Sequence, residues 1–597
     1  MSNRLSPFLS VIFLAGLALR LAALAEYRFV GADGGVDGVV LAISGQNLFS
    51  GAGFSFQGRP ETIHAPLFPI LTGLVWKLCG DLELAGQLVS VLAGALLVFP
   101  VFLLGRSLYS PRTGLISAAM TAVFPAFIYA STEIRLTSLY ALLCATAAWL
   151  MYRNAWAGGF AGGCWTGAAI ALCYLARPEA LLFLPLAGVL PFLVGKHPKD
   201  KQSAPINNAG RVPSFDPALL GSRQECRSHK QDMGTIEGVT VGGTFLSRSR
   251  PSRIAALMPY LAGIALGFAI LSSPYWCFLK RSLGHWTLNG RGPFTFVGYF
   301  RDDWDRAYFD LYTYPDQALR EWRDQGGMAG FMRKNLPQAV ERLARNTAAL
   351  LSLGESPQIA RIGLPPFLVN AAVIVFAVAA IGGGAVRILR RRWLFRDTFL
   401  ALFMATVLPY LVLTWRDLRY FYPYFPLLLI VLAEGCGRWA VWAKGAGRPR
   451  SARRMILAAA PAGIVLLAML LASGALIPLK IRTVPYEYKL LGLWMRETIP
   501  DIEKTVVMSR KMGVPFYAGS RHALIHPGSY SEVIRFAREI DARYLVVDDW
   551  IIPSTRPALA FLLDDAPPPP ELERVHTLEH AGRRIILYRF KTVPGGV

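Results

Sequence analysis

Apolar segments of membrane-spanning length recur along the chain, and they constrain its fold more strongly than any other feature of the sequence. A straight helix needs roughly 20 apolar residues to cross the hydrocarbon core of a bilayer. Candidate spans lie near residues 7–26, 84–105, 113–131, 136–152, 157–175, 179–195, 255–277, 364–386, 397–415, 420–436 and 455–478. Several of them are short, so their boundaries and the count of about eleven are approximate. The pattern predicts a polytopic α-helical membrane protein.

The formal net charge of +23 admits two kinds of partner, nucleic acid and anionic lipid. The Lys and Arg side chains cluster in short loops beside apolar spans, which is the distribution that orients a chain in a membrane. Membrane lipids are therefore the expected partners, and nucleic acid is not. The seven cysteines are scattered, without the spacing of a zinc site or of a disulfide framework.

The basic loops predict the topology. Three connections, at residues 196–253, 387–396 and 444–454, are rich in Lys and Arg. The positive-inside rule places all three in the cytoplasm. Counting spans from a cytoplasmic N-terminus, with an uncleaved first span, agrees with this placement. It puts residues 27–83, 132–135, 278–362 and those after about 480 on the outer side.

This topology divides the chain into four regions. Residues 1–196 form an N-terminal transmembrane module with the first outer loop, and residues 197–253, rich in Pro, Ser, Asn, Gly and Lys, form a disordered cytoplasmic loop. Residues 254–479 contain the remaining spans and the outer loop 278–362. Residues 480–597 alternate strand patterns near 504–509, 542–548 and 584–589 with helices near 489–494 and 530–541, which predicts a C-terminal extracytoplasmic α/β domain.

Acidic and basic side chains gather in the predicted outer loops and at the ends of spans. They are Asp33, Asp37 and His64 in the first loop, Glu133 in a tight turn, Arg177 in a second turn, Lys280 and Arg281 after the seventh span, and Arg416 and Arg419 between the ninth and tenth spans. Charge at a bilayer edge is costly and is more often functional than decorative. A carboxylate can take the proton of an incoming hydroxyl or amine, while Arg, Lys or a divalent cation stabilises a departing phosphate. The set indicates an enzyme that transfers a sugar from a lipid phosphate.

Each of these residues also has a structural interpretation. Asp37 can cap a short helix that starts at Val39, and Asp33 suits a turn in a Gly-rich segment. Glu133 can form an ordinary ion pair with Arg135, and His64 can be structural in its Pro-rich loop. The arginines can be anchors that snorkel to the interface. The functional interpretation rests on the prediction that all of these residues lie on the same side of the membrane.

Several segments, taken in order, resemble the GT-C-fold glycosyltransferases of the protein-mannosyltransferase and aminoarabinose-transferase group. The stretch from Asp37 through Asn47-Leu-Phe-Ser-Gly-Ala-Gly-Phe54 to Pro66-Leu-Phe-Pro69 resembles their first outer loop, in which an acidic residue lies about ten positions before an Asn-Leu pair. Glu133, followed by Leu139-Tyr140, resembles their second outer-loop acid. Further resemblances are Ala176-Arg-Pro-Glu-Ala180, Arg419-Tyr-Phe-Tyr-Pro423, Leu491-Gly-Leu-Trp494, Phe516-Tyr-Ala-Gly519 and Ala542-Arg-Tyr-Leu-Val-Val547. The second acid and Tyr that often follow the first acid are replaced here by Val39, Val40 and Leu41.

The resemblance implies a donor sugar linked to a polyprenyl phosphate, inversion at the anomeric carbon, and a bacterial inner membrane with the C-terminal domain in the periplasm. It implies Asp37 as the general base, and Glu133 as the residue that orients the acceptor or, with Asp33, holds a divalent cation such as Mg or Mn. The remaining predicted substrate-binding or phosphate-binding residues are Arg177, Arg416, Arg419, Tyr420, Lys280 and His64. The acceptor stays open between a protein, a lipid and a glycan.

Two other classes of protein compete with the enzyme. A transporter or lipid-linked sugar flippase also has many spans with ionisable residues, and Arg20 inside the first span fits it equally well. A non-catalytic scaffold is the third alternative. The acids lie at span ends rather than at mid-membrane, and no internal repeat is evident, which favours the transferase.

Overall fold

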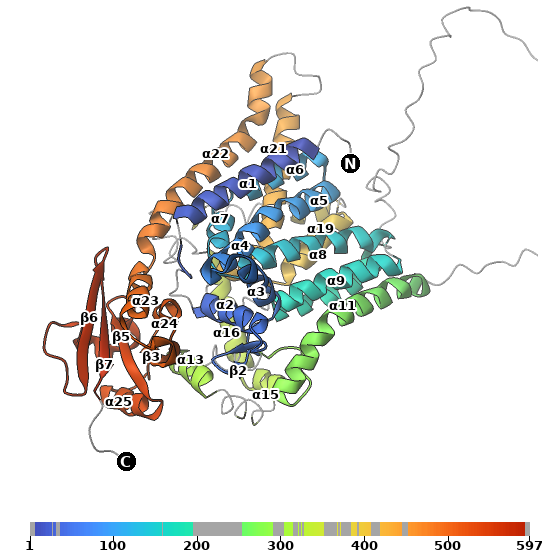
Figure 1. The fold of residues 1–597 in the computed structure, drawn as a ribbon. Helices are drawn as coiled ribbons and strands as arrows, with labels where there is room; N and C mark the ends of the chain where they lie inside the picture. Colours follow the sequence, from blue (N-terminus) through green and yellow to red (C-terminus); the bar gives the residue numbers. More distant parts are fainter. Residues whose placement is uncertain are drawn as a thin grey trace, which may run out of the picture.

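The computed structural model describes residues 6–26, 28–31, 36–157, 159–194, 253–290, 304–314, 320, 324, 327–351, 367, 370–371, 384–390, 393–407, 418–444 and 452–591. Residues 197–252 of the predicted cytoplasmic loop, and most of the predicted span at 364–386, lie outside this part of the chain. Figure 1 shows a bundle of helices with a smaller sheet domain at one end.

The first part of the bundle consists of helices joined by short connections. They are α1 (Ser6–Glu26), α2 (Val36–Phe49), α3 (Leu67–Cys79), α4 (Leu82–Leu96), α5 (Val98–Leu108), α6 (Pro111–Val123), α7 (Pro125–Ser131), α8 (Thr137–Ala157), α9 (Phe160–Ala176), η1 (Pro178–Leu182) and α10 (Phe183–Val194). Between α2 and α3 lies a two-stranded hairpin, β1 (Ser55–Phe56) and β2 (Arg59–Pro60).

The second part contains α11 (Arg253–Leu283), α13 (Trp304–Thr313), α15 (Gly327–Lys334), α16 (Leu336–Leu351), α19 (Phe395–Ala405), η4 (Leu418–Tyr424), α21 (Phe425–Lys444) and α22 (Ala452–Thr483). Helices α9 and α11 pack along their lengths. Their contact is very close, because a Cβ atom added at Gly163 would lie 2.1 Å from the carbonyl oxygen of Tyr260. Small residues at such a contact let two helices approach without a hydrophobic driving force between them.

Five helices of the described part are long and apolar enough to cross a membrane, and a bent pair raises the number to six. The five are Pro7–Glu26, Leu82–Leu108, Leu257–Leu283, Phe421–Ala443 and Ile456–Ala475. The bent pair is Pro111–Val123 with Pro125–Ser131. The predicted spans near 7–26, 84–105, 255–277, 420–436 and 455–478 correspond to these helices, whereas the count of about eleven is not reached by this criterion.

Helices α6 and α7 are bent by 53° relative to each other. Arg20 provides hydrogen-bond donors at this break. Pro125 has no N–H to donate, so carbonyl groups in the last turn of α6 lose their helical partners. Arg20 Nη1 donates to the carbonyl oxygen of Ala122 at 2.9 Å, and Ser473 Oγ of α22 donates to that of Val123, also at 2.9 Å. A buried arginine in α1 therefore satisfies backbone groups that the proline frees.

The C-terminal domain is a five-stranded mixed sheet with flanking helices. Its elements are α23 (Tyr486–Thr498), η5 (Ile502–Lys504), β3 (Val506–Ser509), α24 (Gly513–Ala518), β4 (Arg521–Leu524), α25 (Tyr530–Glu539), β5 (Ala542–Asp548), α26 (Ile552–Thr555), η6 (Pro557–Leu563), β6 (Leu572–His580) and β7 (Arg583–Phe590). The strand order is β4-β3-β5-β7-β6, with β3 parallel to β4 and β5 and the remaining pairs antiparallel. The predicted strands near 504–509, 542–548 and 584–589 and the predicted helices are confirmed, while β4 and β6 were not predicted.

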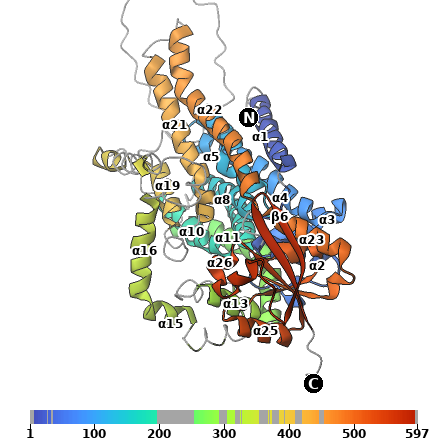
Figure 2. The same cartoon turned by 90° about the vertical axis from the view of Figure 1, so that its left-hand side faces the viewer.

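Helix α13 joins the loop region to the sheet domain. Asp305 of α13 accepts a hydrogen bond of 2.5 Å from Arg510 Nη2 and a second one from the buried Arg556. Phe309, one turn along α13, packs edge-to-face on Phe536 of α25 at 5.3 Å between ring centroids. The domain is thus tied to α13, and it is attached to the bundle through α23, where Lys489 Nζ lies 2.8 Å from Glu83 Oε2 of α4. Figures 1 and 2 agree that the N-terminus lies at the end of the bundle opposite the sheet domain.

Candidate functional site

Asp37 lies in the first turn of α2, with its side chain one-third exposed. The helix starts at Val36, so Asp37 is not the cap of a helix beginning at Val39, and that interpretation is wrong. The positive end of the helix dipole favours a negative charge in this turn. Asp37 Oδ1 lies 3.8 Å from Nε2 of His64, a distance typical of an ion pair rather than of a hydrogen bond.

Glu61 holds the other side of the His64 ring. Its Oε1 atom lies 3.3 Å from His64 Nδ1, and it accepts backbone hydrogen bonds from Ile63 at 2.7 Å and from His64 at 2.8 Å. The imidazole is almost fully buried, with 2% of its side chain exposed. His64 therefore lies between two carboxylates, one on α2 and one on the loop that precedes α3. We call Asp37, His64 and Glu61 the carboxylate–histidine chain.

The charge of His64 follows from this environment. Burial lowers the pKa of the imidazole, but the contacts with Asp37 and Glu61 outweigh it and raise the pKa from 6.5 to about 9. His64 is consequently an imidazolium at neutral pH, and both of its ring nitrogens carry protons. Such a ring stabilises the ionised form of the carboxylates beside it.

Glu133 lies in the turn between α7 and α8, where its side chain is 1% exposed. Its Oε2 atom is 3.4 Å from Nη1 of Arg135, so the predicted ion pair is present. Helix α4 holds the turn, because Gln87 Nε2 donates to the carbonyl oxygen of Thr132 at 3.2 Å and Ser90 Oγ to that of Arg135 at 3.1 Å. The carboxylate is thus fixed on a turn that is itself fixed to a neighbouring helix.

Gly38 brings the Asp37 and Glu133 segments into contact. A Cβ atom at this position would lie 2.9 Å from the carbonyl oxygen of Ile134 and 2.8 Å from that of Val30. A larger residue has no room there, so the first turn of α2 packs directly on the turn that carries Glu133. The two predicted acids therefore belong to touching segments, although 96 positions separate them in the sequence.

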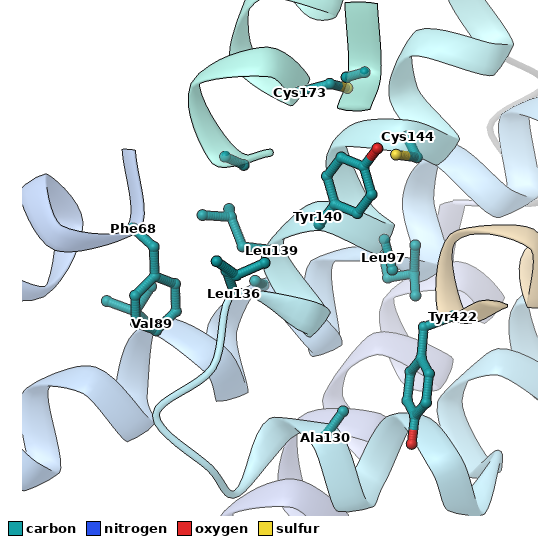
Figure 3. Close-up of a cluster of buried hydrophobic side chains, with 14 of the residues drawn as sticks. Phe68, Val89, Leu97, Ala130, Leu136, Leu139, Tyr140, Cys144, Cys173 and Tyr422 are labelled. Carbon is teal, nitrogen blue, oxygen red and sulfur yellow. The ribbon is translucent and has the colours of Figure 1, made fainter. Parts of the chain in front are cut away.

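Arg177 reaches the same region from the end of α9. Its guanidinium lies 5.6 Å from the ring centroid of Tyr140, which is in the first turn of α8 beyond the Glu133 turn. Figure 3 shows Tyr140 among the buried side chains where α8 meets its neighbours, close to Leu139 and Cys144. η4, which contains Arg419 and Tyr420, also packs against α8. Three of the predicted segments therefore converge on the start of α8.

The other predicted residues are placed differently or not described. Lys280 is exposed in the last turn of α11, where its ammonium lies 4.5 Å from the ring centroid of Trp286 rather than in the carboxylate–histidine chain. Asp33 and Arg416 lie outside the described residues, and of Arg419 and Tyr420 only the backbone is described. Within the described residues, no three His, Cys, Asp or Glu side chains gather in a way that could hold a metal ion.

A cleft of about 610 Å³ opens beside this region, between the first loop and the C-terminal domain. Its lining includes Gln57, Arg59 and Glu61 from the loop, and Arg521 and His522 from β4. None of these five residues was predicted from the sequence. Only Glu61 offered a signal, since it stands three positions before His64.

The comparisons with known proteins concern the family and the fold of the chain. Residues 63–207, about a quarter of the chain, match the family model described as dolichyl-phosphate-mannose-protein mannosyltransferase. The matched range contains His64, Glu133 and Arg177. No curated protein matches the sequence.

Similar solved structures come from an archaeon and a bacterium. The apo oligosaccharyltransferase of Archaeoglobus fulgidus is 16% identical with a TM-score of 0.54, over 92% of this chain and 70% of that chain. The archaeal oligosaccharyltransferase of the same organism in complex with an inhibitory peptide and a dolichol-phosphate has 16% identity and a TM-score of 0.51, over 92% and 69%. The ArnT protein of Cupriavidus metallidurans bound to undecaprenyl phosphate has 12% identity and a TM-score of 0.49, over 97% of both chains. The shared fold with the archaeal enzyme and the family match confirm the resemblance to GT-C glycosyltransferases that the sequence motifs predicted.

Proposed function

We propose that this chain, a membrane glycosyltransferase with the GT-C fold, transfers a monosaccharide from a polyprenyl-phosphate carrier to a hydroxyl or amine acceptor at the outer face of a bacterial inner membrane. The observation that carries the proposal is the carboxylate–histidine chain at the start of α2, packed against the Glu133 turn. The lipid-phosphate donor has further support from the name of the matching family and from the dolichol-phosphate in the archaeal complex.

In the proposed reaction, Asp37 takes the proton of the acceptor as its oxygen or nitrogen attacks the anomeric carbon. A new bond forms between acceptor and sugar, the bond between the anomeric carbon and the phosphate oxygen breaks, and polyprenyl phosphate leaves with the electron pair. Attack from the face opposite the phosphate inverts the anomeric configuration. His64 keeps Asp37 ionised and oriented, because the imidazolium ring lies 3.8 Å from its Oδ1 atom and cannot turn while Glu61 holds it.

The departing phosphate gains negative charge in the transition state, so cationic groups that face it lower the barrier. We assign this role to Arg177, to Arg419 of η4, and to Arg416, which precedes Arg419 in the sequence. Glu133 orients the acceptor, with Arg135 fixing its carboxylate. Tyr420 completes the phosphate site, and Lys280 with Trp286 anchors α11 at the bilayer surface, where aromatic rings and long cationic side chains are favoured.

The proposed orientation has a cytoplasmic N-terminus and a periplasmic C-terminal domain. It is supported by the position of the N-terminus, which lies at the opposite end of the helical bundle from the sheet domain in both views (Figures 1 and 2). The ends of α21 and α22 that border the basic connection 444–454 lie at the same end as the N-terminus. This arrangement matches the topology that the positive-inside rule predicts.

A transporter or flippase is the alternative, and Arg20 inside the first span fits it as well as it fits the transferase. The guanidinium of Arg20 donates to carbonyl oxygens of Gly16 and Ala122 and to Ser131 Oγ, at 2.8, 2.9 and 3.2 Å. These contacts give Arg20 a structural role at a helix break, which supports the transferase over the transporter.

The test compares the intact protein with Asp37→Asn, each purified and offered a panel of radiolabelled polyprenyl-phosphate sugars with membrane extract as the acceptor source. Asp501→Asn serves as a matched control, because this carboxylate is exposed in a turn of the C-terminal domain. We expect the intact protein and the control to transfer label, and Asp37→Asn to bind the donor without transferring it. Equal transfer by all three would refute the role of Asp37. Donor binding without transfer by any of them, together with movement of the donor across vesicles, would favour a flippase.

A further inference from the structure

We infer that the C-terminal domain holds the first turn of α2, and with it Asp37, through the side chains of Tyr517 and Lys489. Both side chains bond the backbone of residues 28–30, which lie between α1 and α2. They are positioning residues, because they act on Asp37 through this short segment and not on the substrate. This role rests on the proposed function only for the identity of Asp37 as the base, since the holding of the segment can be measured without a donor.

Residues 28–30 form neither helix nor strand, so their backbone groups need partners from other elements. Two of these partners come from the C-terminal domain. Lys489 Nζ of α23 donates to the carbonyl oxygen of Arg28 at 2.8 Å. The N–H of Val30 donates to the hydroxyl oxygen of Tyr517 in α24 at 2.9 Å. The domain is thus bonded to both ends of the segment.

Glu83 of α4 fixes the two side chains on the helical bundle. Its Oε2 atom accepts a hydrogen bond from Lys489 Nζ at 2.8 Å, and its Oε1 atom accepts one from the Tyr517 hydroxyl at 3.2 Å. Glu83 and Tyr517 are buried, and only 12% of the Lys489 side chain is exposed. Because the Tyr517 hydroxyl gives its proton to Glu83, an oxygen lone pair remains for the N–H of Val30. Burial raises the pKa of Tyr517 well above its ordinary value, so the hydroxyl keeps this proton at neutral pH.

Helices α23 and α24 support these two side chains as one unit. A Cβ atom added at Gly492 of α23 would lie 2.6 Å from Cβ of Tyr517 and 2.6 Å from the carbonyl oxygen of Val514. The two helices are therefore in direct contact one turn beyond Lys489. Because no side chain separates the helices at this point, Tyr517 and Lys489 keep a fixed spacing.

Val30 transmits this restraint to the first turn of α2. Its side chain is fully buried. A Cβ atom added at Gly38 would lie 2.8 Å from the carbonyl oxygen of Val30, so this carbonyl group is in contact with the turn that carries Asp37. Close-packed interiors transmit small displacements, and a shift of about 1 Å in a catalytic group can slow a reaction about a hundredfold. Losing a domain contact should therefore displace Asp37 enough to slow transfer.

Gln87 of α4 extends the same arrangement to the Glu133 turn. Its buried Nε2 atom donates to the carbonyl oxygens of Phe29 and Thr132, each at 3.2 Å. Thr132 is adjacent to Glu133 in the sequence. One side chain therefore bonds both the segment that leads to Asp37 and the turn that carries Glu133, which fixes the separation of the two acids.

The first test measures amide hydrogen exchange of the full chain in nanodiscs, without donor. Tyr517→Phe removes only a hydroxyl, so the N–H of Val30 loses its acceptor. We expect exchange of residues 28–40 to accelerate by about tenfold, while the strands of the sheet exchange at the parent rate. Tyr530→Phe is the matched control, because it removes a hydroxyl that bonds Glu571 within the domain, at 3.2 Å, and it should leave residues 28–40 unchanged.

Two more variants show which contact acts on which segment. Lys489→Met removes the donor to the carbonyl oxygen of Arg28 and should also accelerate exchange of residues 28–40. Gln87→Leu removes the donor shared by Phe29 and Thr132, so it should accelerate exchange both there and in the turn that carries Glu133.

The second test measures transfer with labelled donor. Tyr517→Phe should lower kcat by about tenfold or more and change KM for the donor by less than about twofold, because a displaced base slows only the transfer step. A contact that merely attached the domain would leave kcat unchanged in the folded protein. Tyr530→Phe should keep the parent kcat and KM.

Three results overturn the inference. They are parent exchange of residues 28–40 in both Tyr517→Phe and Lys489→Met, equal acceleration throughout the sheet domain, and accelerated exchange of residues 28–40 with the parent kcat. The two proposals fail separately. If the intact protein transfers no sugar, the proposed function is contradicted, and the exchange pattern alone decides whether the domain holds the first turn of α2.

Discussion

The charge of His64 makes a quantitative prediction for the variant His64→Gln, which keeps a polar side chain of similar size but cannot titrate. The pKa of His64 rises from 6.5 to about 9 because the attraction of Asp37 and Glu61 outweighs burial. A raised pKa in the folded protein means that protonation stabilises the fold. The contribution is fully present below pH 6.5 and is lost as the pH rises through 9. Its size is about 3 kcal/mol, since each unit of pKa corresponds to about 1.4 kcal/mol.

The assay is the free energy of unfolding in mixed micelles at increasing SDS, measured from pH 6 to pH 10 for the intact protein and for His64→Gln. We expect the intact protein to be more stable at pH 6 and its advantage to shrink by about 3 kcal/mol toward pH 10. His522→Gln is the matched control. Its pKa is lowered from 6.5 to about 4 by burial, so between pH 6 and about pH 7.5 the difference should change by less than about 1 kcal/mol, in the direction opposite to His64, and it should stay flat above that pH.

Transfer activity tests the role of the carboxylate–histidine chain independently of stability. The activity of the intact protein should fall as the pH rises above 9, because the neutral His64 ring no longer attracts the Asp37 carboxylate and so no longer holds it in position. His64→Gln should have a lower kcat at every pH and should lack this decline. A stability difference that is constant within about 1 kcal/mol from pH 6 to pH 10 would refute the reasoning, as would a decline in activity that survives in the variant.

Two further predictions concern the contacts that position the site. Arg20→Met leaves the carbonyl oxygen of Ala122 without the donor that now lies at 2.9 Å, and should lower the free energy of unfolding by about 1–3 kcal/mol while kcat is retained; unchanged stability would show that the helix break needs no donor. Asp305→Asn removes the carboxylate shared by Arg510 and Arg556 and should cost about 3 kcal/mol of local stability. Hydrogen exchange in α13 should then accelerate, and exchange at the parent rate would contradict the proposed attachment.

The strands of the C-terminal domain differ in how far the sequence predicts them. β3 is buried throughout and β5 is buried except at Arg543, and both read as short apolar runs, Val506-Val-Met-Ser509 and Ala542-Arg-Tyr-Leu-Val-Val-Asp548, so they were predicted. β4 has the sequence Arg-His-Ala-Leu and no strand pattern. It is a strand because β3 pairs with it on one side, which is a tertiary effect that local propensity does not contain.

The candidate site was predicted only in part for a related reason. Asp37 and Glu133 could be selected because each follows a span at a position where charge is costly. The contact between Asp37 and His64 could not be predicted. Glu61 and His64 come 24 or more positions after Asp37, and only the fold of their loop brings them beside it. His64 was predicted as a substrate-binding residue, whereas its contacts in the structure are with two carboxylates.

Glu61 connects the cleft to the proposed base. It lines the cleft, and its Oε1 atom lies 3.3 Å from Nδ1 of His64, whose Nε2 atom is 3.8 Å from Asp37 Oδ1. Because Glu61 and Asp37 lie on opposite sides of one imidazolium ring, the ring can hold Asp37 in place only while Glu61 holds the ring. Glu61 therefore belongs to the positioning of the base, although the sequence places it 24 residues after Asp37. The His64→Gln change removes this support without removing a group that faces the departing phosphate, so it should reduce kcat more than it reduces donor affinity.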